Sequence, residues 1–283
     1  MFKKQLEIIV GDVRKVSEEI ARRTIAEIQE AQKAGRNYVM ACAKGSSAVE
    51  YYKDLRQSDR DFSGVVAFCI DEDLGTSNAV NFLVKNLPPN ILINGIDAKF
   101  YQDGQLVDSN LFQQIMKTTP VYYGLIGREI NPRGPSGLPA EIKEACQSYE
   151  ERIEAKGVID IAIIGLGVDP MHIGSNFPPT CDDSRTHLGE KVDAEGNVIG
   201  YAMTMGIATL CSARQVVLFA AGEKKAEGVR VMMEEPIGPS CPPSYLRNMG
   251  NLVLALDQTA TSMLDLNELP RIYRDRGLVL RCR

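Results

Sequence analysis

Short apolar runs alternate with stretches of helical periodicity along most of the chain. The runs are mostly apolar throughout, instead of alternating with polar residues, which is typical of strands buried on both faces of a parallel sheet. They cover residues 38–43, 65–70, 90–93, 161–164, 201–205, 216–220 and 252–256. Between them, residues 13–34 and 139–153 place apolar residues at helical spacing. The pattern predicts an α/β fold with one doubly wound, mostly parallel sheet, in a single domain over residues 1–283.

Residues 97–137 interrupt this alternation. Residues 99–107 resemble a hairpin whose turn lies at Asp103-Gly104, and residues 131–137 are rich in proline and glycine. We interpret the segment as an insertion on the α/β core.

The stretch from 159 to 179 combines a buried strand with candidate chemistry. The apolar run 161–164 reaches Gly165-Leu166-Gly167, where we expect the chain to leave the sheet in a tight turn. Asp169 and His172 follow, at the end of a strand where open α/β sheets bind ligands. Two alternatives compete with a catalytic site. One is a dinucleotide fingerprint, whose third glycine would fall at Pro170, and the other is an ordinary loop histidine.

Two earlier strands also end in polar loops. Residues 38–43 lead into Lys44-Gly45-Ser46-Ser47, where Ser47 can begin the next helix. This joint is either a phosphate cradle of backbone N–H groups and hydroxyls or a plain turn with serine as N-cap. Residues 65–70 run into Asp71-Glu72-Asp73, which are either carboxylates facing a cleft or a solvated acidic turn.

Composition narrows the function classes. The 283 residues are 44% hydrophobic with a net charge of −5, without a basic tract, which argues against a nucleic-acid partner. We expect no membrane span and no secretion signal, because no apolar run is long enough. Seven dispersed cysteines predict reduced thiols and a cytoplasmic location. With two histidines and no clustered ligands, we expect no metal site.

Four segments together resemble the glucosamine-6-phosphate deaminase and 6-phosphogluconolactonase superfamily, whose fold is Rossmann-like. They are ACAKGSSA (41–48), FCIDEDLG (68–75), CQSYEERI through IGLGVDPMHIGSNFPP (146–179) and YAMTMGIATLCSARQVVLFAAGEKKA (201–226). The resemblance covers most of the chain outside the insertion.

The resemblance implies a role for each loop. The sugar phosphate would be held by Gly45, Ser46, Ser47 and Lys225. Asp71 would be the base that moves a proton between C1 and C2, His172 would open the sugar ring, and Asp169 would orient His172. No metal or organic cofactor is implied.

The chain also departs from the family pattern. The Asp-Gly-His of the family becomes residues 169–172, which is one residue longer, and residues 175–178 lack the glutamate of the deaminases. Lys44 stands where the family usually has glycine, and the arginine that grips the phosphate has no evident counterpart. Arg185, in a Ser-Arg-Thr that resembles an allosteric segment of some deaminases, is a further candidate for that contact, and Lys44 and Glu72 are further site candidates.

The leading hypothesis is a sugar-6-phosphate isomerase or deaminase of the glucosamine-6-phosphate deaminase type. One alternative is a 6-phosphogluconolactonase-like hydrolase, in which His172 acts as general base on a water molecule. The other is a non-catalytic module that binds a sugar phosphate. In each case the partner is a phosphorylated sugar, and the family resemblance implies a homo-oligomer.

Overall fold

A central parallel sheet organises the computed structural model, which describes residues 5–102, 105–112, 138–169, 171–269, 273 and 277–282. Every neighbouring pair along its main path is parallel. The strands, in spatial order, are β14 (Gly277–Cys282), β1 (Gln5–Val10), β13 (Asn251–Leu256), β12 (Gln215–Ala220), β8 (Ile161–Gly167), β2 (Tyr38–Cys42), β3 (Val65–Cys69) and β5 (Leu92–Asn94). This confirms the predicted α/β class.

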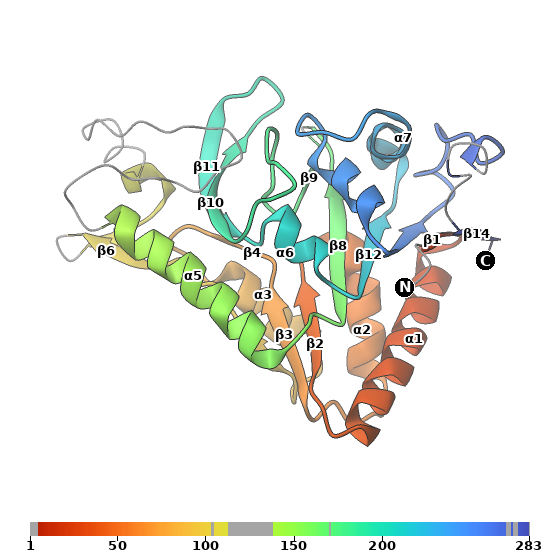
Figure 1. The fold of residues 1–283 in the computed structure, drawn as a ribbon, viewed down its shortest axis with the longest axis horizontal. Coiled ribbons are helices and arrows are strands. Elements are labelled where there is room, and N and C mark those ends of the chain that lie inside the picture. The colour runs from red at the N-terminus through yellow and green to blue at the C-terminus, as the bar shows by residue number, and fades with distance from the viewer. Residues whose placement is uncertain are drawn as a thin grey trace.

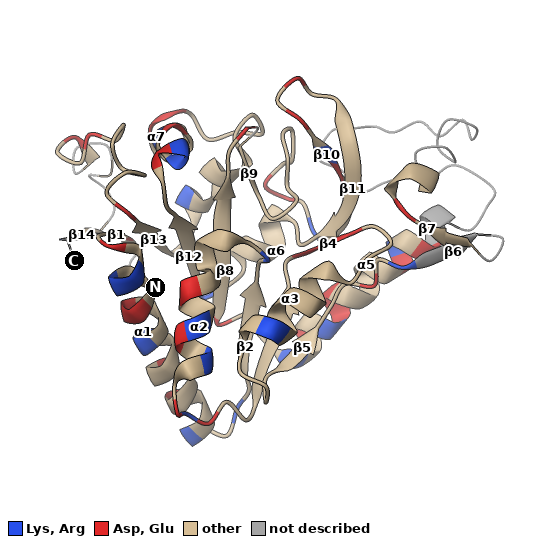
Figure 2. Cartoon of the chain, turned by 180° about the vertical axis from the view of Figure 1, so that it is seen from behind, with Lys and Arg blue, Asp and Glu red and all other residues tan. Residues whose placement is uncertain are grey.

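Helices cover both faces of this sheet (Figure 1). On one face lie α1 (Val13–Lys33), α2 (Val49–Gln57) and α3 (Asn78–Asn86), and on the other lie α5 (Leu138–Lys156) and α7 (Ala226–Glu234). Figure 2, which views the molecule from behind, places α2 and α3 in front and interleaves charges of both signs along α1 and α2.

The two helical layers explain the continuous apolar runs. Met40 and Cys42 pack into the core under α1 to α3, whereas Val39 and Ala41 pack into the core under α5 and α7. Because successive side chains of a strand point to opposite faces, a strand between two cores is apolar at every position.

A second, antiparallel sheet lies beyond the carboxyl ends of the central strands. It consists of β10 (His187–Val192), β11 (Val198–Thr204) and β4 (Asp71–Asp73). Only Ile70 separates β4 from β3, so the short sheet is tied directly to the central one. A two-residue strand, β9 (His172–Ile173), pairs back on the end of β8.

The remaining elements are short. They are η1 (Ser46–Ala48), β6 (Phe100–Gln102), β7 (Gln105–Val107), α6 (Ile207–Cys211), η2 (Glu223–Lys225) and η3 (Pro242–Asn248). Strands β6 and β7 pair antiparallel, as expected of a hairpin over residues 99–107. The proline- and glycine-rich loop at 131–137 lies outside the described residues. No helix in the described part of the chain is long and apolar enough to cross a membrane.

Two expectations about single elements are wrong. Residues 165–167 continue strand β8 and do not form a turn, because β9 pairs back on them. The apolar run 252–256 followed by Asp257 predicts a helix capped by Asp257, but turns follow instead, and the carboxylate accepts a hydrogen bond from the N–H of Ala260. Strand β10 lies within residues 181–200, a polar, glycine-containing segment.

Candidate functional site

We call the region beyond the carboxyl ends of β2 and β8 the crevice, because the strand order makes it the switch point of the sheet. From β2 the chain proceeds through β3 and β5 to one edge of the sheet, whereas from β8 it proceeds through β12 and β13 toward the other. Neighbouring β2 and β8 therefore mark the point where the winding direction reverses, and ligands of open α/β sheets bind outside such a point. The loops that follow β2, β3 and β8 carry the residues proposed from sequence.

The short strand β4 divides three consecutive carboxylates between two faces. Asp71 is opposite Thr204 and Asp73 is opposite Ala202, so these two side chains share one face of the small sheet. Glu72 points the other way, where its carboxylate accepts hydrogen bonds from the N–H of Ala79 at 3.0 Å and from the Thr76 hydroxyl at 2.7 Å. Glu72 thus caps the N-terminus of α3.

Asp71 is the buried carboxylate of the crevice. Its side chain is 6% exposed, and Glu72 is 1% exposed, so a solvated acidic turn does not describe these two residues. The Ser175 hydroxyl donates to Oδ2 of Asp71 at 2.8 Å. Burial raises the pKa of Asp71, while the charge of Lys44 and the Ser175 hydrogen bond oppose that rise. A carboxylate with a raised pKa beside a hydroxyl suits reversible proton transfer.

Asp73 bridges two lysines on the same face. Lys44 Nζ donates to its Oδ2 at 2.7 Å and Lys191 Nζ donates to its Oδ1 at 2.8 Å. Burial acts to raise the pKa of Asp73, but the two lysine hydrogen bonds hold this pKa below its usual value. Burial acts to lower the pKa of Lys44, but Asp71 and Asp73 raise it on balance, so both ionic forms persist.

Lys191 is absent from the residues proposed from sequence, and Asp73 is named there only as one of three consecutive carboxylates, without a role of its own. Strand alternation from Asp71 could have indicated Asp73, had the acidic triplet been recognised as a strand. The contact of Lys191 with Asp73 depends on the pairing of β10 with β11, which no local sequence pattern specifies.

His172 lies against the end of β8 in a position that requires glycine opposite it. His172 pairs with Gly167 across the β8–β9 ladder, and a Cβ atom at Gly167 would stand 2.1 Å from Cε1 of the imidazole. The ring also stacks on Phe177, with centroids 4.1 Å apart and an interplanar angle of 20°. The glycine therefore serves close approach of the histidine, and not the predicted turn.

Residues 168–171 connect β8 to β9. Asp169 is exposed and takes a left-handed conformation, with φ of 64°, which aspartate tolerates better than most residues. Pro170 lies outside the described residues. Orientation of His172 by Asp169 stays a prediction.

The loop after β2 and Lys225 meet at the same part of β8. Ser47 lies against Gly165, with its Oγ 3.6 Å from the position that a Cβ of Gly165 would occupy. Lys225, in η2, donates from Nζ to the carbonyl of Leu166 at 2.5 Å, and burial lowers its pKa. Among the described residues, no side chain caps η1 or α2, so serine does not act there as N-cap. The backbone N–H groups of this joint, which includes Gly45, Ser46 and Ser47, are therefore available to a ligand or water.

Arg185 lies at the edge of the crevice region and contacts α5. Its side chain is 60% exposed and stands 3.5 Å from Oε2 of Glu150. The other oxygen of Glu150 accepts hydrogen bonds from the hydroxyls of Thr186 and Thr209. The Ser-Arg-Thr segment is therefore anchored to α5 through Glu150.

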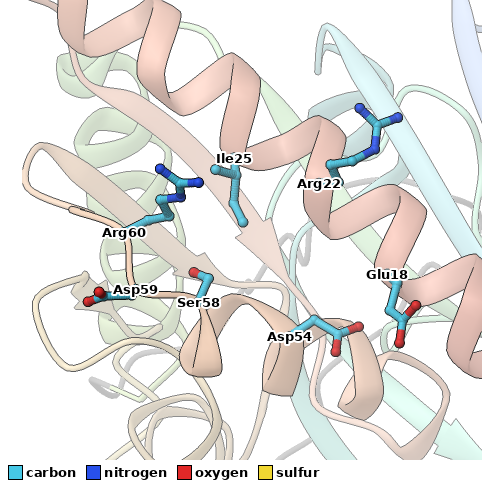
Figure 3. Close-up of a pocket in the computed structure, with 7 residues that line it drawn as sticks. All are labelled: Glu18, Arg22, Ile25, Asp54, Ser58, Asp59 and Arg60. Atoms are coloured by element: carbon cyan, nitrogen blue, oxygen red, sulfur yellow. The ribbon is translucent and has the colours of Figure 1, made fainter.

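A separate groove runs between α1 and α2 (Figure 3). Glu18, Arg22 and Ile25 of α1 line one side. The other side is lined by Asp54 of α2 and by Ser58, Asp59 and Arg60 of the loop that follows α2. None of these residues belongs to the loops that follow β2, β3 and β8. Within the described residues, no group of histidine, cysteine, aspartate or glutamate side chains has the arrangement of a metal site.

Comparison with known proteins identifies relatives of the whole fold. The family model described as glucosamine-6-phosphate isomerases/6-phosphogluconolactonase matches residues 105–254. A glucosamine-6-phosphate deaminase of Streptococcus thermophilus is 28% identical over 236 residues, which are 80% of this chain and 87% of the relative.

Solved structures from both branches share the fold. A monomeric glucosamine-6-phosphate deaminase superposes with a TM-score of 0.65 at 23% identity, covering 91% of this chain and 99% of the other. A 6-phosphogluconolactonase from Leishmania guyanensis gives a TM-score of 0.66 at 19% identity, covering 92% of this chain and 99% of the other.

Proposed function

Because the chain belongs to the family of glucosamine-6-phosphate isomerases and 6-phosphogluconolactonases, we propose that it is a sugar-6-phosphate isomerase or deaminase of the glucosamine-6-phosphate deaminase type. The observation that carries the proposal is the hydrogen bond from Ser175 to Asp71. It joins the loop that follows His172 to the strand that contains the buried carboxylate, which supports a single site that uses both an acid and an imidazole.

The phosphate would bind at the end of β8. Gly45, Ser46 and Ser47 supply backbone N–H groups and hydroxyls, and the Lys225 ammonium lies beside the same strand end, at Leu166. Such donors fix the phosphate oxygens, and the ammonium adds the charge that an acidic chain needs locally.

Asp71 would then shuttle the proton. As a carboxylate it takes the proton from C2 of the open-chain sugar, and as a carboxylic acid it returns that proton to C1. With a hydroxyl at C2 the product is a ketose, and with an amine the resulting imine is hydrolysed to a ketose and ammonia. The raised pKa of Asp71 favours both halves of this cycle, since the acid and the base then lie closer in free energy.

His172 would open the ring. Its imidazole is fixed between Gly167 and Phe177, which limits the orientations available to its nitrogens. Proton transfer between the ring oxygen and the C1 hydroxyl requires a group that gives and takes protons near neutral pH, and imidazole is such a group.

A 6-phosphogluconolactonase-like hydrolase is the second candidate. Residues 173–177 contain no carboxylate to assist His172 in ring opening, and the loop carries Ser175 and Phe177 instead. In that chemistry His172 would be the general base for a water molecule attacking the lactone carbonyl.

Two assays separate the candidates. Fructose 6-phosphate and ammonia formed from glucosamine 6-phosphate support the first, and accelerated hydrolysis of the lactone alone supports the second. We expect Asp71→Asn and His172→Ala to abolish turnover while glucosamine 6-phosphate, at 100 times its dissociation constant, still adds about 2.7 kcal/mol to the free energy of unfolding. Asp59→Asn, in the α1–α2 groove, is the matched control and should retain activity.

Binding without turnover in either assay would contradict both enzymes and select the non-catalytic module.

We further propose a cytoplasmic homo-oligomer. Free thiols support the location, because the six described cysteines form no disulfide. Light scattering on the purified chain tests the oligomer, and a monomer, like the solved deaminase described as monomeric, would refute it.

A further inference from the structure

Three charged groups converge beside Asp71, the proposed proton shuttle. Lys44 comes from the loop after β2, Asp71 and Asp73 from β4, and Lys191 from β10. The two lysines are bonded to the two oxygens of Asp73, and Lys44 and Lys191 are also the cations that act on Asp71. We call Lys44, Asp73 and Lys191 the lysine bridge.

The bridge is ordered and partly removed from water. The side chains of Lys44, Asp73 and Lys191 are 24%, 27% and 32% exposed. Holding two long side chains in one geometry costs conformational entropy, and ion pairs of this exposure return little stability. Glu72 caps α3, and strands β4 and β10 each pair with β11 through the backbone, so other contacts than the bridge hold these elements in place.

The net charge of Lys44, Asp71, Asp73 and Lys191 changes at one step of the reaction, when the proton is removed from the substrate. With Asp71 ionised, two carboxylates and two ammonium groups sum to zero. When Asp71 takes a proton from the substrate it becomes neutral, and the single positive charge of the lysine bridge is no longer balanced by Asp71. At that moment the substrate gains one negative charge, so the attraction appears in the transition state and is absent in the ground state.

We infer that Lys44 is a catalytic residue that stabilises the oxyanion of the enediolate, and that Asp73 and Lys191 are positioning residues for its ammonium. The inference rests on the proposed function. The C2–H bond breaks and its proton goes to Asp71. Its electron pair forms the C1–C2 double bond, and the π pair of the C1 carbonyl moves to O1, which accepts a hydrogen bond from Lys44. The proton on the C2 hydroxyl or amine is then transferred to O1, and the lone pair left on that oxygen or nitrogen forms its double bond to C2. The C1–C2 π pair takes the proton back from Asp71 at C1, which restores the carboxylate and completes the shift.

Geometry separates this role from the phosphate contact. The proposed phosphate donors gather at Gly165 and Leu166 of β8, whereas the ammonium of Lys44 is bonded to Asp73, on the same face of β4 as Asp71. An ammonium has three donors, so Lys44 keeps capacity for a substrate oxygen while bonded to Asp73. The raised pKa of Lys44 keeps it charged at neutral pH.

The test follows loss of deuterium from C2 of deuterated glucosamine 6-phosphate, whether to C1 or to solvent, together with kcat and KM. We expect Lys44→Met to lower the exchange rate and kcat by about 100-fold, the loss typical of one oxyanion donor, with KM changed less than about threefold. Lys44→Arg should restore part of the rate, because it keeps the charge. Lys33→Met, on the exposed end of α1, is the matched control and should behave as the wild type.

A pH profile separates this role from a structural one. Loss of the Lys44 charge raises the pKa of Asp71, so the acid limb of kcat/KM should move to higher pH. Lys191→Met should shift it in the same direction by less, and it serves as the second variant if Lys44→Met fails to fold.

Wild-type exchange rates in Lys44→Met, or a raised KM with unchanged kcat, would overturn the inference while leaving the proposed function intact. Absence of exchange and of ketose formation in the wild type would overturn the proposed function, and this inference with it.

Discussion

Substitution of Gly167 by alanine tests the placement of His172 directly. A methyl group at this position would stand 2.1, 2.3 and 2.4 Å from Cε1, Nε2 and Nδ1 of the imidazole. Optimal contact between carbon atoms begins at about 3.5 Å, so the ring would have to move by about 1.4 Å. No left-handed backbone angle occurs at Gly167, so the clash with the ring is the whole perturbation.

A displacement of this size has a large expected effect on rate. Misplacement of a catalytic group by about 1 Å can cost about 100-fold, so we expect Gly167→Ala to lower kcat/KM by that factor. Loss of the stack on Phe177 should lower the free energy of unfolding by about 1 kcal/mol. Steady-state kinetics with glucosamine 6-phosphate and chemical denaturation measure the two quantities.

Gly250→Ala, just before β13, is the matched control. Its methyl group would meet no atom within 4 Å and the backbone there is not left-handed, so activity and stability should stay near wild type. Wild-type kinetics in Gly167→Ala, or equal damage from both substitutions, would refute the assignment of His172 to this position.

Three further predictions concern buried carboxylates. Burial raises the pKa of Asp71 in the folded state, so the contribution of the Asp71 side chain to the free energy of unfolding is present at low pH and is lost as pH rises through that pKa. Asp71→Asn should therefore stabilise the protein at pH 8 and progressively less toward pH 4. A difference in melting temperature between mutant and wild type that does not depend on pH would contradict this. For the wild type, the acid limb of kcat/KM should have its midpoint above the ordinary aspartate value of about 3.9. Asp160, 4% exposed, accepts from the N–H of Val39 and from Arg36, so Asp160→Ala should cost about 2 kcal/mol of unfolding free energy by urea denaturation. Because Asp160 lies at the other end of β8, kcat/KM should stay unchanged, and a loss of activity without loss of stability would contradict that view.

The central sheet could be predicted from sequence because its signal is local. Residues such as Ile161 to Ile164 are apolar at every position, since both faces of β8 are covered by core. Strand β1 is buried in the same way, but its apolar run is broken by Glu7. Arg23 of α1 and Arg281 of β14 neutralise that carboxylate, and these partners are 16 and 274 positions away.

The sequence could indicate residues of the candidate site only where they follow directly after a recognisable strand. Asp71, His172 and Ser47 each follow a recognisable strand, so the topology of a parallel sheet brings them to one edge. The lysine bridge instead joins residues from three elements, and Lys191 reaches Asp73 only because β10 and β11 extend the sheet that β4 begins. The distance between those partners along the chain, 118 positions, leaves no local pattern to detect.

The alternation within β4 also limits how this segment can vary. One residue inserted after Ile70 would turn all three side chains over, so that Glu72, which now caps α3, would enter the crevice and Asp71, the proposed base, would face the helix. We therefore expect inserted residues to be tolerated between β8 and β9, where the pairing of Gly167 with His172 fixes both ends of the connection. We expect them not to be tolerated within Asp71–Asp73. Natural variation in loop length should accordingly spare this strand, and changes of specificity there should arise by substitution.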